Sequence, residues 1–141
     1  MLEGFDNLFE SDDVEYPLRD KTFDFLIHLM KCRDQLRINH WQTTAYSEHK
    51  TTDKLIGDLT DYIDSIGETA LGYFGRPQIT STANNITDIQ LMPSQQIIST
   101  LEYITNEMLN LFKDTEYEGI TALLGELISD IQKRKYLLTL K

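Results

Sequence analysis

Residues 45–77 decide the fold, and they read AYSEHKTTDKLIGDLTDYIDSIGETALGYFGRP. Apolar residues recur in this stretch at every third or fourth position, the spacing that places side chains on one face of an α-helix. Gly75-Arg76-Pro77 is typical of a helix end, because glycine readily adopts the left-handed conformation and proline cannot continue a helix. The pattern predicts a helix over 45–74, capped by Thr44 or Ser47. Its apolar face holds Leu55, Ile56, Leu59, Tyr62, Ile63, Ile66, Ala70, Tyr73 and Phe74.

Helical periodicity continues on both sides of this stretch. It predicts further helices over 18–40, 94–113 and 120–140, and no segment has the alternating pattern of a strand. Residues 78–94 are rich in Thr, Asn and Ser, which indicates a long crossover with one short helix near 88–91. Two closely linked helix pairs joined by one long connection predict an all-α fold, a ferritin-like four-helix bundle.

The composition describes a single acidic domain. The 141 residues carry 13 Lys and Arg against 23 Asp and Glu, a formal net charge of -10, and this length fits one domain with one core. Cys32 is the only cysteine, which excludes an internal disulfide and a thiolate zinc site and favours a reducing compartment. There is no apolar run of about 18 residues and no basic leader before an apolar stretch. We therefore expect a cytoplasmic protein without a membrane segment.

Residues 1–17 differ from the rest of the chain. The first 20 residues hold seven acids and one base. Four large apolar side chains stand among the acids: Leu2, Phe5, Leu8 and Phe9. Two interpretations stay open: a flexible, solvated tail that ends near Pro17, or a short docking segment whose apolar side chains enter a groove of a partner. In both, the predicted bundle domain is 18–141.

The helix over 45–74 also carries potential metal ligands beside its apolar face. Four residues lie within about 100° of one another on a helical wheel, and we call them the ligand wedge: His49, Asp53, Asp64 and Glu68. The first two are one turn apart, as are the last two, but the two pairs are separated by about 16 Å along the helix axis. One helix therefore cannot bring all four side chains to one ion.

The ligand wedge is symmetric about a point between Asp58 and Leu59. If the helix crosses a second copy of itself antiparallel at that point, the first pair of each copy meets the second pair of the other. An isologous dimer would then hold two identical sites. Gly57 and Thr60 obey the same symmetry, and such small residues let two helices approach closely. This explains a glycine that costs a helix interior about 1 kcal/mol relative to alanine.

The residue types in the wedge indicate which ion would bind. Three carboxylates and an imidazole suit a hard or borderline divalent ion such as Fe(II), Mn(II) or Zn(II). The opposing interpretation is a solvated acidic face without a ligand. His40, at the end of the first predicted helix, is either a core histidine or a further metal ligand with Trp41 as a buried wall beside it. His28 is interpreted as a surface residue and Cys32 as an inert one.

These residues resemble the Dps-like branch of the ferritin superfamily. The resemblance rests on four motifs: His40-Trp41, the string His49-x3-Asp53-x10-Asp64-x3-Glu68, Gly75-Arg76-Pro77, and GITALLGEL at 119–127. It implies that His49 and Asp53 come from one subunit and Asp64 and Glu68 from its partner, with His40 in the role of the family's first histidine. It also implies a hollow dodecamer that oxidises Fe(II) with peroxide or oxygen and stores ferric mineral. Short forms of this kind look similar to Dps-like proteins carried by bacteriophages.

Two departures from that family keep an alternative open. The segment from His40 to His49 is shorter than the family's usual spacing, and an acidic N-terminus stands where some members carry a basic tail that coats DNA. The leading prediction is a ferroxidase and iron-storage protein with the ligand wedge as its catalytic residues. The alternative is a non-catalytic helical assembly protein that docks to a larger complex through its acidic tail. The negative charge disfavours DNA binding.

Overall fold

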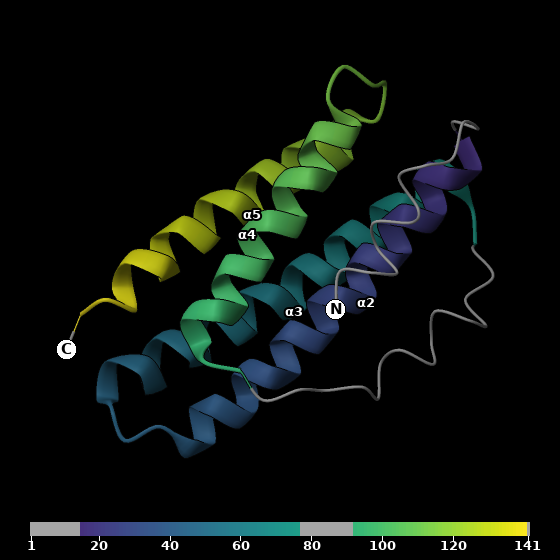
Figure 1. Cartoon of the computed structure of the whole chain (residues 1–141). Helices are drawn as coiled ribbons and strands as arrows, with labels where there is room; N and C mark the ends of the chain where they lie inside the picture. Colours follow the sequence, from purple (N-terminus) through teal and green to yellow (C-terminus); the bar gives the residue numbers. More distant parts are fainter. Residues whose placement is uncertain (1–14, 77–91, 141) are drawn as a thin grey trace.

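The computed structural model describes residues 15–76 and 92–140. It consists of four helices (Figure 1): α2 (Glu15–Gln42), α3 (Tyr46–Phe74), α4 (Ser94–Phe112) and α5 (Glu118–Leu137). No strand occurs within these described ranges. The predicted all-α class is confirmed, and each helix boundary lies within three residues of its prediction. The short helix expected near 88–91 and residues 1–14 of the tail predicted over 1–17 lie outside the described residues; the last three residues of that tail belong to α2.

The two ends of α3 show what local sequence can and cannot predict. At the C-terminal end, Gly75 has a positive φ of 77° and donates its N–H to the Leu71 carbonyl at 3.0 Å, as the Gly-Arg-Pro signal predicts. The predicted N-terminal caps are wrong, because Ala45 is the capping residue. Its N–H donates to the Thr43 hydroxyl at 3.1 Å, and the Ser47 hydroxyl donates to the Leu140 carbonyl at 2.5 Å instead.

Hydrogen bonds at the helix ends fix the direction of each helix. α4 starts beside the end of α2, where the Asn39 amide donates to the Met92 carbonyl at 2.7 Å and to the Ser94 hydroxyl at 3.2 Å. α5 starts beside the end of α3, where the Gly119 N–H donates to the Tyr73 hydroxyl at 3.1 Å. The helices therefore run up, down, down and up, and α3 ends at the opposite end of the bundle from the start of α4 (Figure 1).

Helix packing closes a four-helix bundle around one core. α2 packs against α3 and α4, and α5 packs against the same two helices, so neighbours around the bundle are antiparallel. Each fully buried leucine-sized side chain contributes about 1.5–3 kcal/mol to folding. The largest of these are Phe25, Phe112, Leu29, Leu36, Leu55, Leu59, Ile66, Ile97, Ile98, Leu101 and Ile104. The predicted apolar face of α3 is confirmed except at Tyr73, which is 42% exposed.

A polar contact joins α3 to α5 at the edge of this core. The Tyr62 hydroxyl donates to Asp130 Oδ2 at 2.7 Å, and one helical turn away on each helix Arg134 forms an ion pair with Asp58 at 3.0 Å. Burial, and secondly the hydrogen bond to Asp130, raise the pKa of Tyr62 above its usual value. The folded chain therefore keeps the phenol proton at a pH where the unfolded chain releases it. Stability from this group is complete below about pH 10 and declines above it.

Replacing Tyr62 by phenylalanine tests this contact. We expect Tyr62→Phe to lower the free energy of unfolding by about 1 kcal/mol at pH 8, because the Asp130 carboxylate loses its donor. The variant should also lose less stability than the wild type between about pH 9.5 and pH 11. Urea unfolding at a series of pH values measures both effects. Tyr136→Phe is the matched control, since Tyr136 is 63% exposed; equal changes in the two variants would contradict the assignment.

Candidate metal site on α3

His40 and His49 lie face to face where α2 turns into α3. Their rings stack with centroids 3.9 Å apart and planes 18° apart. His40 Nδ1 donates to the His49 carbonyl at 2.8 Å, and His49 Nδ1 donates to the His40 carbonyl at 3.1 Å. His40 Nδ1 also lies 3.3 Å from the Thr52 hydroxyl oxygen. Each histidine thus holds the backbone of the other in a reciprocal pair.

This arrangement fixes the tautomer of both imidazoles. A carbonyl oxygen can only accept a hydrogen bond, so the proton of each ring lies on Nδ1. In the neutral form the lone pair is then on Nε2, the nitrogen left for a metal ion. An Nδ1–H bonded to a backbone carbonyl is a common way in which proteins orient a histidine ligand. The sequence indicated each histidine as a possible metal ligand. It did not predict that the link between α2 and α3 would stack the His40 ring on the His49 ring.

Short hydrogen bonds hold the turn that brings the two rings together. The Thr43 hydroxyl donates to Glu48 Oε1 at 2.5 Å, and the Thr52 hydroxyl donates to the Glu48 carbonyl at 2.7 Å. Thr52 is fully buried although it is polar, because its hydroxyl is bonded within the first turns of α3. The first turns of α3 are therefore tied both to the link before them and to their own backbone.

The carboxylates of the ligand wedge lie on the outer surface of α3. All four wedge residues are exposed, as are Gly57 and Thr60. A Cβ added at Gly57 would meet nothing within 4 Å, so the outer side of α3 is open at the centre of the predicted crossing. Within the described part of one chain, no three His, Cys, Asp or Glu side chains are placed to hold a metal ion. The predicted site therefore stays a prediction about two copies of α3.

Three other sequence predictions meet a clear outcome. His28 is not a surface residue: it is 3% exposed, and its Nδ1 donates to the Asp24 carbonyl at 2.9 Å. Trp41 is not a buried wall beside the histidines, because it is 70% exposed. Cys32 is fully buried, and burial raises the pKa of its thiol to about 12. A thiol that stays protonated is a poor nucleophile, which agrees with an inert role.

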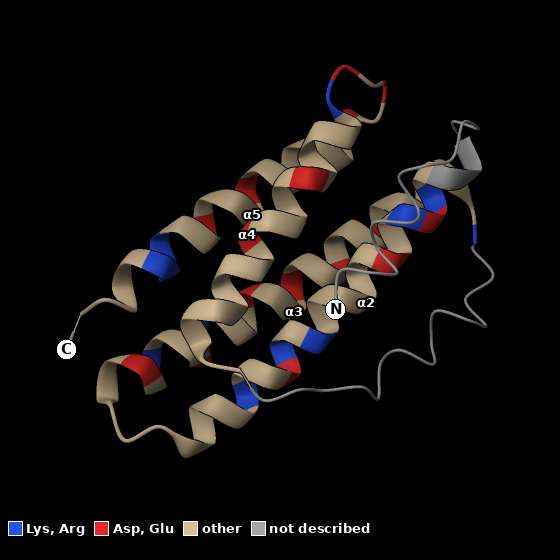
Figure 2. Cartoon of the chain, in the orientation of Figure 1, with Lys and Arg blue, Asp and Glu red and all other residues tan. Residues whose placement is uncertain are grey.

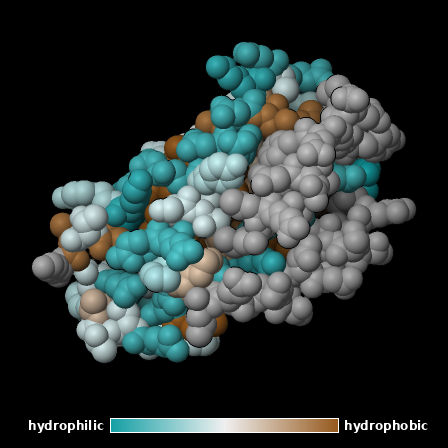
Figure 3. All heavy atoms as spheres, viewed as in Figure 1, coloured by the Kyte–Doolittle hydropathy of each residue, from teal (hydrophilic) through white to brown (hydrophobic). Residues whose placement is uncertain are grey.

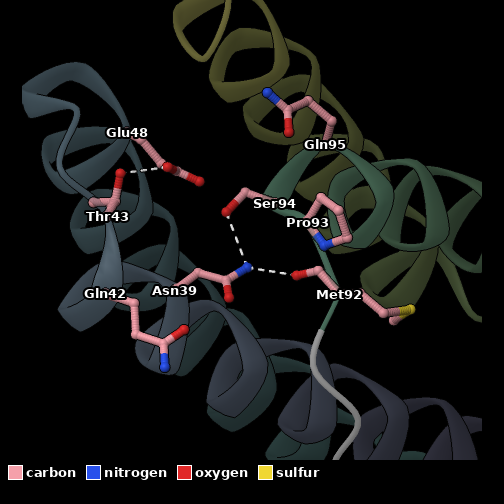
Figure 4. A pocket seen from close by; sticks show the side chains of 8 residues that line it. All are labelled: Asn39, Gln42, Thr43, Glu48, Met92, Pro93, Ser94 and Gln95. Carbon is pink, nitrogen blue, oxygen red and sulfur yellow. Dashed lines mark hydrogen bonds between the residues drawn. The ribbon is translucent and has the colours of Figure 1, made fainter.

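An open cavity of about 500 Å³ adjoins the same turn. Figure 4 shows its walls, in which the Asn39 amide reaches Met92 and Ser94 while Thr43 and Glu48 bond to each other. Eight residues line it: Asn39, Gln42, Thr43, Glu48, Met92, Pro93, Ser94 and Gln95. They come from three chain segments, and no single segment carries a motif for them, so sequence spacing could not indicate this cavity.

These features define an all-helical bundle protein with one helix that carries an exposed row of potential metal ligands. The chain belongs to a family of unknown function, DUF5856, whose profile matches residues 40–138. It is similar to an uncharacterized 14.6 kDa protein from the mobD-ri intergenic region of Enterobacteria phage T4, with 28% identity over 121 residues, 86% of this chain and 90% of that protein. No solved structure matches. None of the described helices is long and apolar enough to span a bilayer.

The resemblance to the Dps-like branch of the ferritin superfamily is therefore wrong as a family assignment. The matching family is DUF5856, and its profile includes His40 and the whole ligand wedge. The error has a physical origin. Acids and histidines four residues apart recur on acidic amphipathic helices in general. Four helices with one long connection can be formed by many unrelated sequences, so this arrangement does not identify a family. The expected relation to phage proteins agrees with the T4 relative.

Proposed function

We propose that two copies of the chain associate through α3 across a two-fold axis and bind Fe(II) as a substrate at two equivalent sites. Each site takes His49 and Asp53 from one copy and Asp64 and Glu68 from the other, with His40 as a further ligand from the first copy. The observation that carries the proposal is the reciprocal histidine pair. It leaves both Nε2 lone pairs available on a surface where the other donors are carboxylates.

Two features of the α3 surface support association of this kind. The ligand wedge is exposed along its whole length, so a second helix can reach all of its members. Open space over Gly57 permits close approach at the centre of the crossing. Association brings three carboxylates together at each site, and they repel one another until a cation neutralises them, which gives the dimer a reason to bind metal. Mn(II) or Zn(II) would use the same donors.

Fe(II) oxidation is the reaction that this donor set favours. Carboxylates stabilise Fe(III) relative to Fe(II) because they bring more negative charge to the ion. Two Fe(II) ions give one electron each to one molecule of hydrogen peroxide, whose O–O bond breaks, and two protons complete two molecules of water. Both imidazoles must be neutral to bind, so Fe(II) affinity should fall as the solution is made acidic.

An anaerobic Fe(II) titration, followed by addition of peroxide, tests this proposal. Saturable binding with rapid formation of ferric absorbance is expected for the wild type. Asp64→Asn with Glu68→Gln should weaken Fe(II) binding by at least about tenfold. Glu116→Gln with Glu126→Gln removes the same charge at exposed positions outside the wedge and should change it less than about twofold. An equal loss of Fe(II) affinity in both double variants would show that binding depends only on the net charge of the protein.

A second candidate function is a non-catalytic assembly protein. The observation in its favour is the exposure of two large aromatic residues at the α2–α3 turn, Trp41 at 70% and Tyr46 at 72%, since exposed aromatic side chains are enriched at protein interfaces. If Fe(II) binding is no stronger than to unstructured acidic peptide while the chain still self-associates, this function replaces the first one.

A further inference from the structure

A second cavity lies between the start of α3 and the end of α5, beside the His49 and Asp53 half of the ligand wedge. Its volume is about 330 Å³, at the lower end of the range for ligand pockets. Eight residues line it: Tyr46, Ser47, Lys50, Thr51, Lys54, Arg134, Leu137 and Leu140. Apolar surface gathers at this end of the molecule, around the C-terminal end of the chain (Figure 3). The cavity thus has apolar walls and three cations around them.

Two of these cations form no ion pair within the described part of the chain. Arg134 forms its ion pair with Asp58 at 3.0 Å. Lys50 and Lys54 are exposed and form no ion pair with any residue that the structure describes; the Lys50 ammonium lies over the Tyr46 ring at 5.8 Å from its centroid. The last turns of α5 add further basic surface (Figure 2). In a chain of net charge -10, this is a local basic patch next to an apolar hollow.

The first 14 residues of the chain have the complementary chemistry. They read MLEGFDNLFESDDV, with five acids and no Lys or Arg. Phe5, Leu8 and Phe9 are spaced among these acids. An aromatic side chain can fill an apolar hollow of this size while flanking carboxylates meet the rim cations, the usual arrangement of an anchored peptide.

Chain length decides which copy supplies this segment. The cavity lies far from Glu15, where α2 begins. Its wall residue Lys50 follows His49, and the His49 ring stacks on that of His40. His40 lies 25 positions after Glu15, or about 38 Å along α2. A fully extended chain spans about 22 Å from Phe9 to Glu15 and about 36 Å from Phe5 to Glu15. Phe9 of a chain therefore falls well short of its own cavity, and Phe5 comes near it only if the whole segment is fully extended, whereas the aromatic residues of a neighbouring copy meet no such limit.

We propose that residues 1–14 of one copy dock into the cavity between α3 and α5 of another copy. Phe5 or Phe9 fills the apolar hollow against Leu137 and Leu140, and the acids of the segment pair with Lys50 and Lys54. The contact uses no residue of the ligand wedge, although Lys50 and Lys54 adjoin His49 and Asp53, so it needs no metal ion. Because it is mainly electrostatic at its rim, it weakens as salt is added.

Photo-cross-linking of the full chain tests this docking. The photoreactive analogue p-benzoylphenylalanine replaces Phe5, and equal amounts of unlabelled and ¹⁵N-labelled chains are mixed before irradiation. We expect cross-links between light and heavy chains that map to residues 46–54 or 134–140. The double variant Lys50→Glu, Lys54→Glu should lower their yield more than about fivefold, as should 0.5 M salt. Lys113→Glu, a charge reversal at an exposed lysine at the end of α4, should leave the yield within about twofold.

The possible outcomes separate this inference from the proposed function. Cross-links only within one isotope class, cross-links that map elsewhere, no cross-links, or a yield that ignores Lys50 and Lys54 would each overturn it. Far-ultraviolet circular dichroism confirms that each variant is folded. The Asp64→Asn, Glu68→Gln variant should cross-link like the wild type. Normal cross-linking with no Fe(II) binding would leave the docking intact and remove the iron site, and the reverse pattern would do the opposite.

Discussion

Mixing two variants that each bind Fe(II) at least about tenfold more weakly than the wild type is expected to restore about one quarter of the wild-type sites. One variant lacks the first pair of the ligand wedge, His49→Ala with Asp53→Asn, and the other lacks the second pair, Asp64→Asn with Glu68→Gln. In a mixed two-fold dimer, one site loses both pairs and the other keeps both. Random pairing makes about half of the dimers mixed, and each mixed dimer holds one intact site of two.

Anaerobic Fe(II) titration measures this recovery after the variants are unfolded together in urea and refolded as a mixture. Each variant refolded alone is the first control. The second control is a mixture of either variant with the Glu116→Gln, Glu126→Gln protein, which keeps the whole ligand wedge. It measures the Fe(II) binding that remains when a defective variant is mixed with a chain whose ligands are intact. Recovery cannot occur if each site belongs to one chain, so a mixture as inactive as its two components would eliminate the shared-site arrangement.

Phe112→Ala is expected to lower the free energy of unfolding by about 3–5 kcal/mol, a large fraction of the stability of a domain of this size. Phe112 is fully buried at the end of α4, with its ring centroid 6.4 Å from that of Phe74 and 6.0 Å from that of Tyr117. Removing it leaves a cavity between three helix ends that the surrounding rings cannot fill without moving.

Urea unfolding followed by circular dichroism measures this loss. Tyr136→Ala, at a position 63% exposed on α5, is the control and should cost less than about 1 kcal/mol. Phe112→Leu should recover part of the loss, because it returns apolar volume to the same space. A small effect of Phe112→Ala would mean that these helix ends repack or that they contribute little to global stability.

The helices could be predicted from sequence because each carries its own periodic signal. α3 shows this most clearly, with its apolar face from Leu55 to Ala70 and its end at Gly75. The contacts that the sequence could not predict are those that depend on the angle between two helices. The stacking of His40 on His49 is set by the turn over 43–45, where the Thr43 hydroxyl bonds to both Ala45 and Glu48. No pattern in the local sequence specifies that angle.

The same distinction explains the other errors. His28 lies off the apolar stripe of its helix and is still buried, because periodicity describes one helix and burial depends on everything packed around it. The family resemblance failed for a related reason. It relied on ligand spacing along one helix and on three short motifs, at 40–41, 75–77 and 119–127. The spacing predicts a shared site, but neither the spacing nor the motifs indicate which family contains it. The cavity between α3 and α5 combines residues more than 80 positions apart, so it could be found only in the folded chain.

The order of the helices also determines the electric field of the bundle. Each helix carries about half a positive charge at its start and half a negative charge at its end. α2 and α5 run one way and α3 and α4 the other, and each helix packs mainly against antiparallel neighbours. The terminal charges therefore largely cancel at both ends of the bundle. The backbone therefore gives the molecule little dipole along its axis. A cation that approaches the molecule is guided by side chains alone, toward the acids on the outside of α3, while an acidic segment is guided toward Lys50 and Lys54.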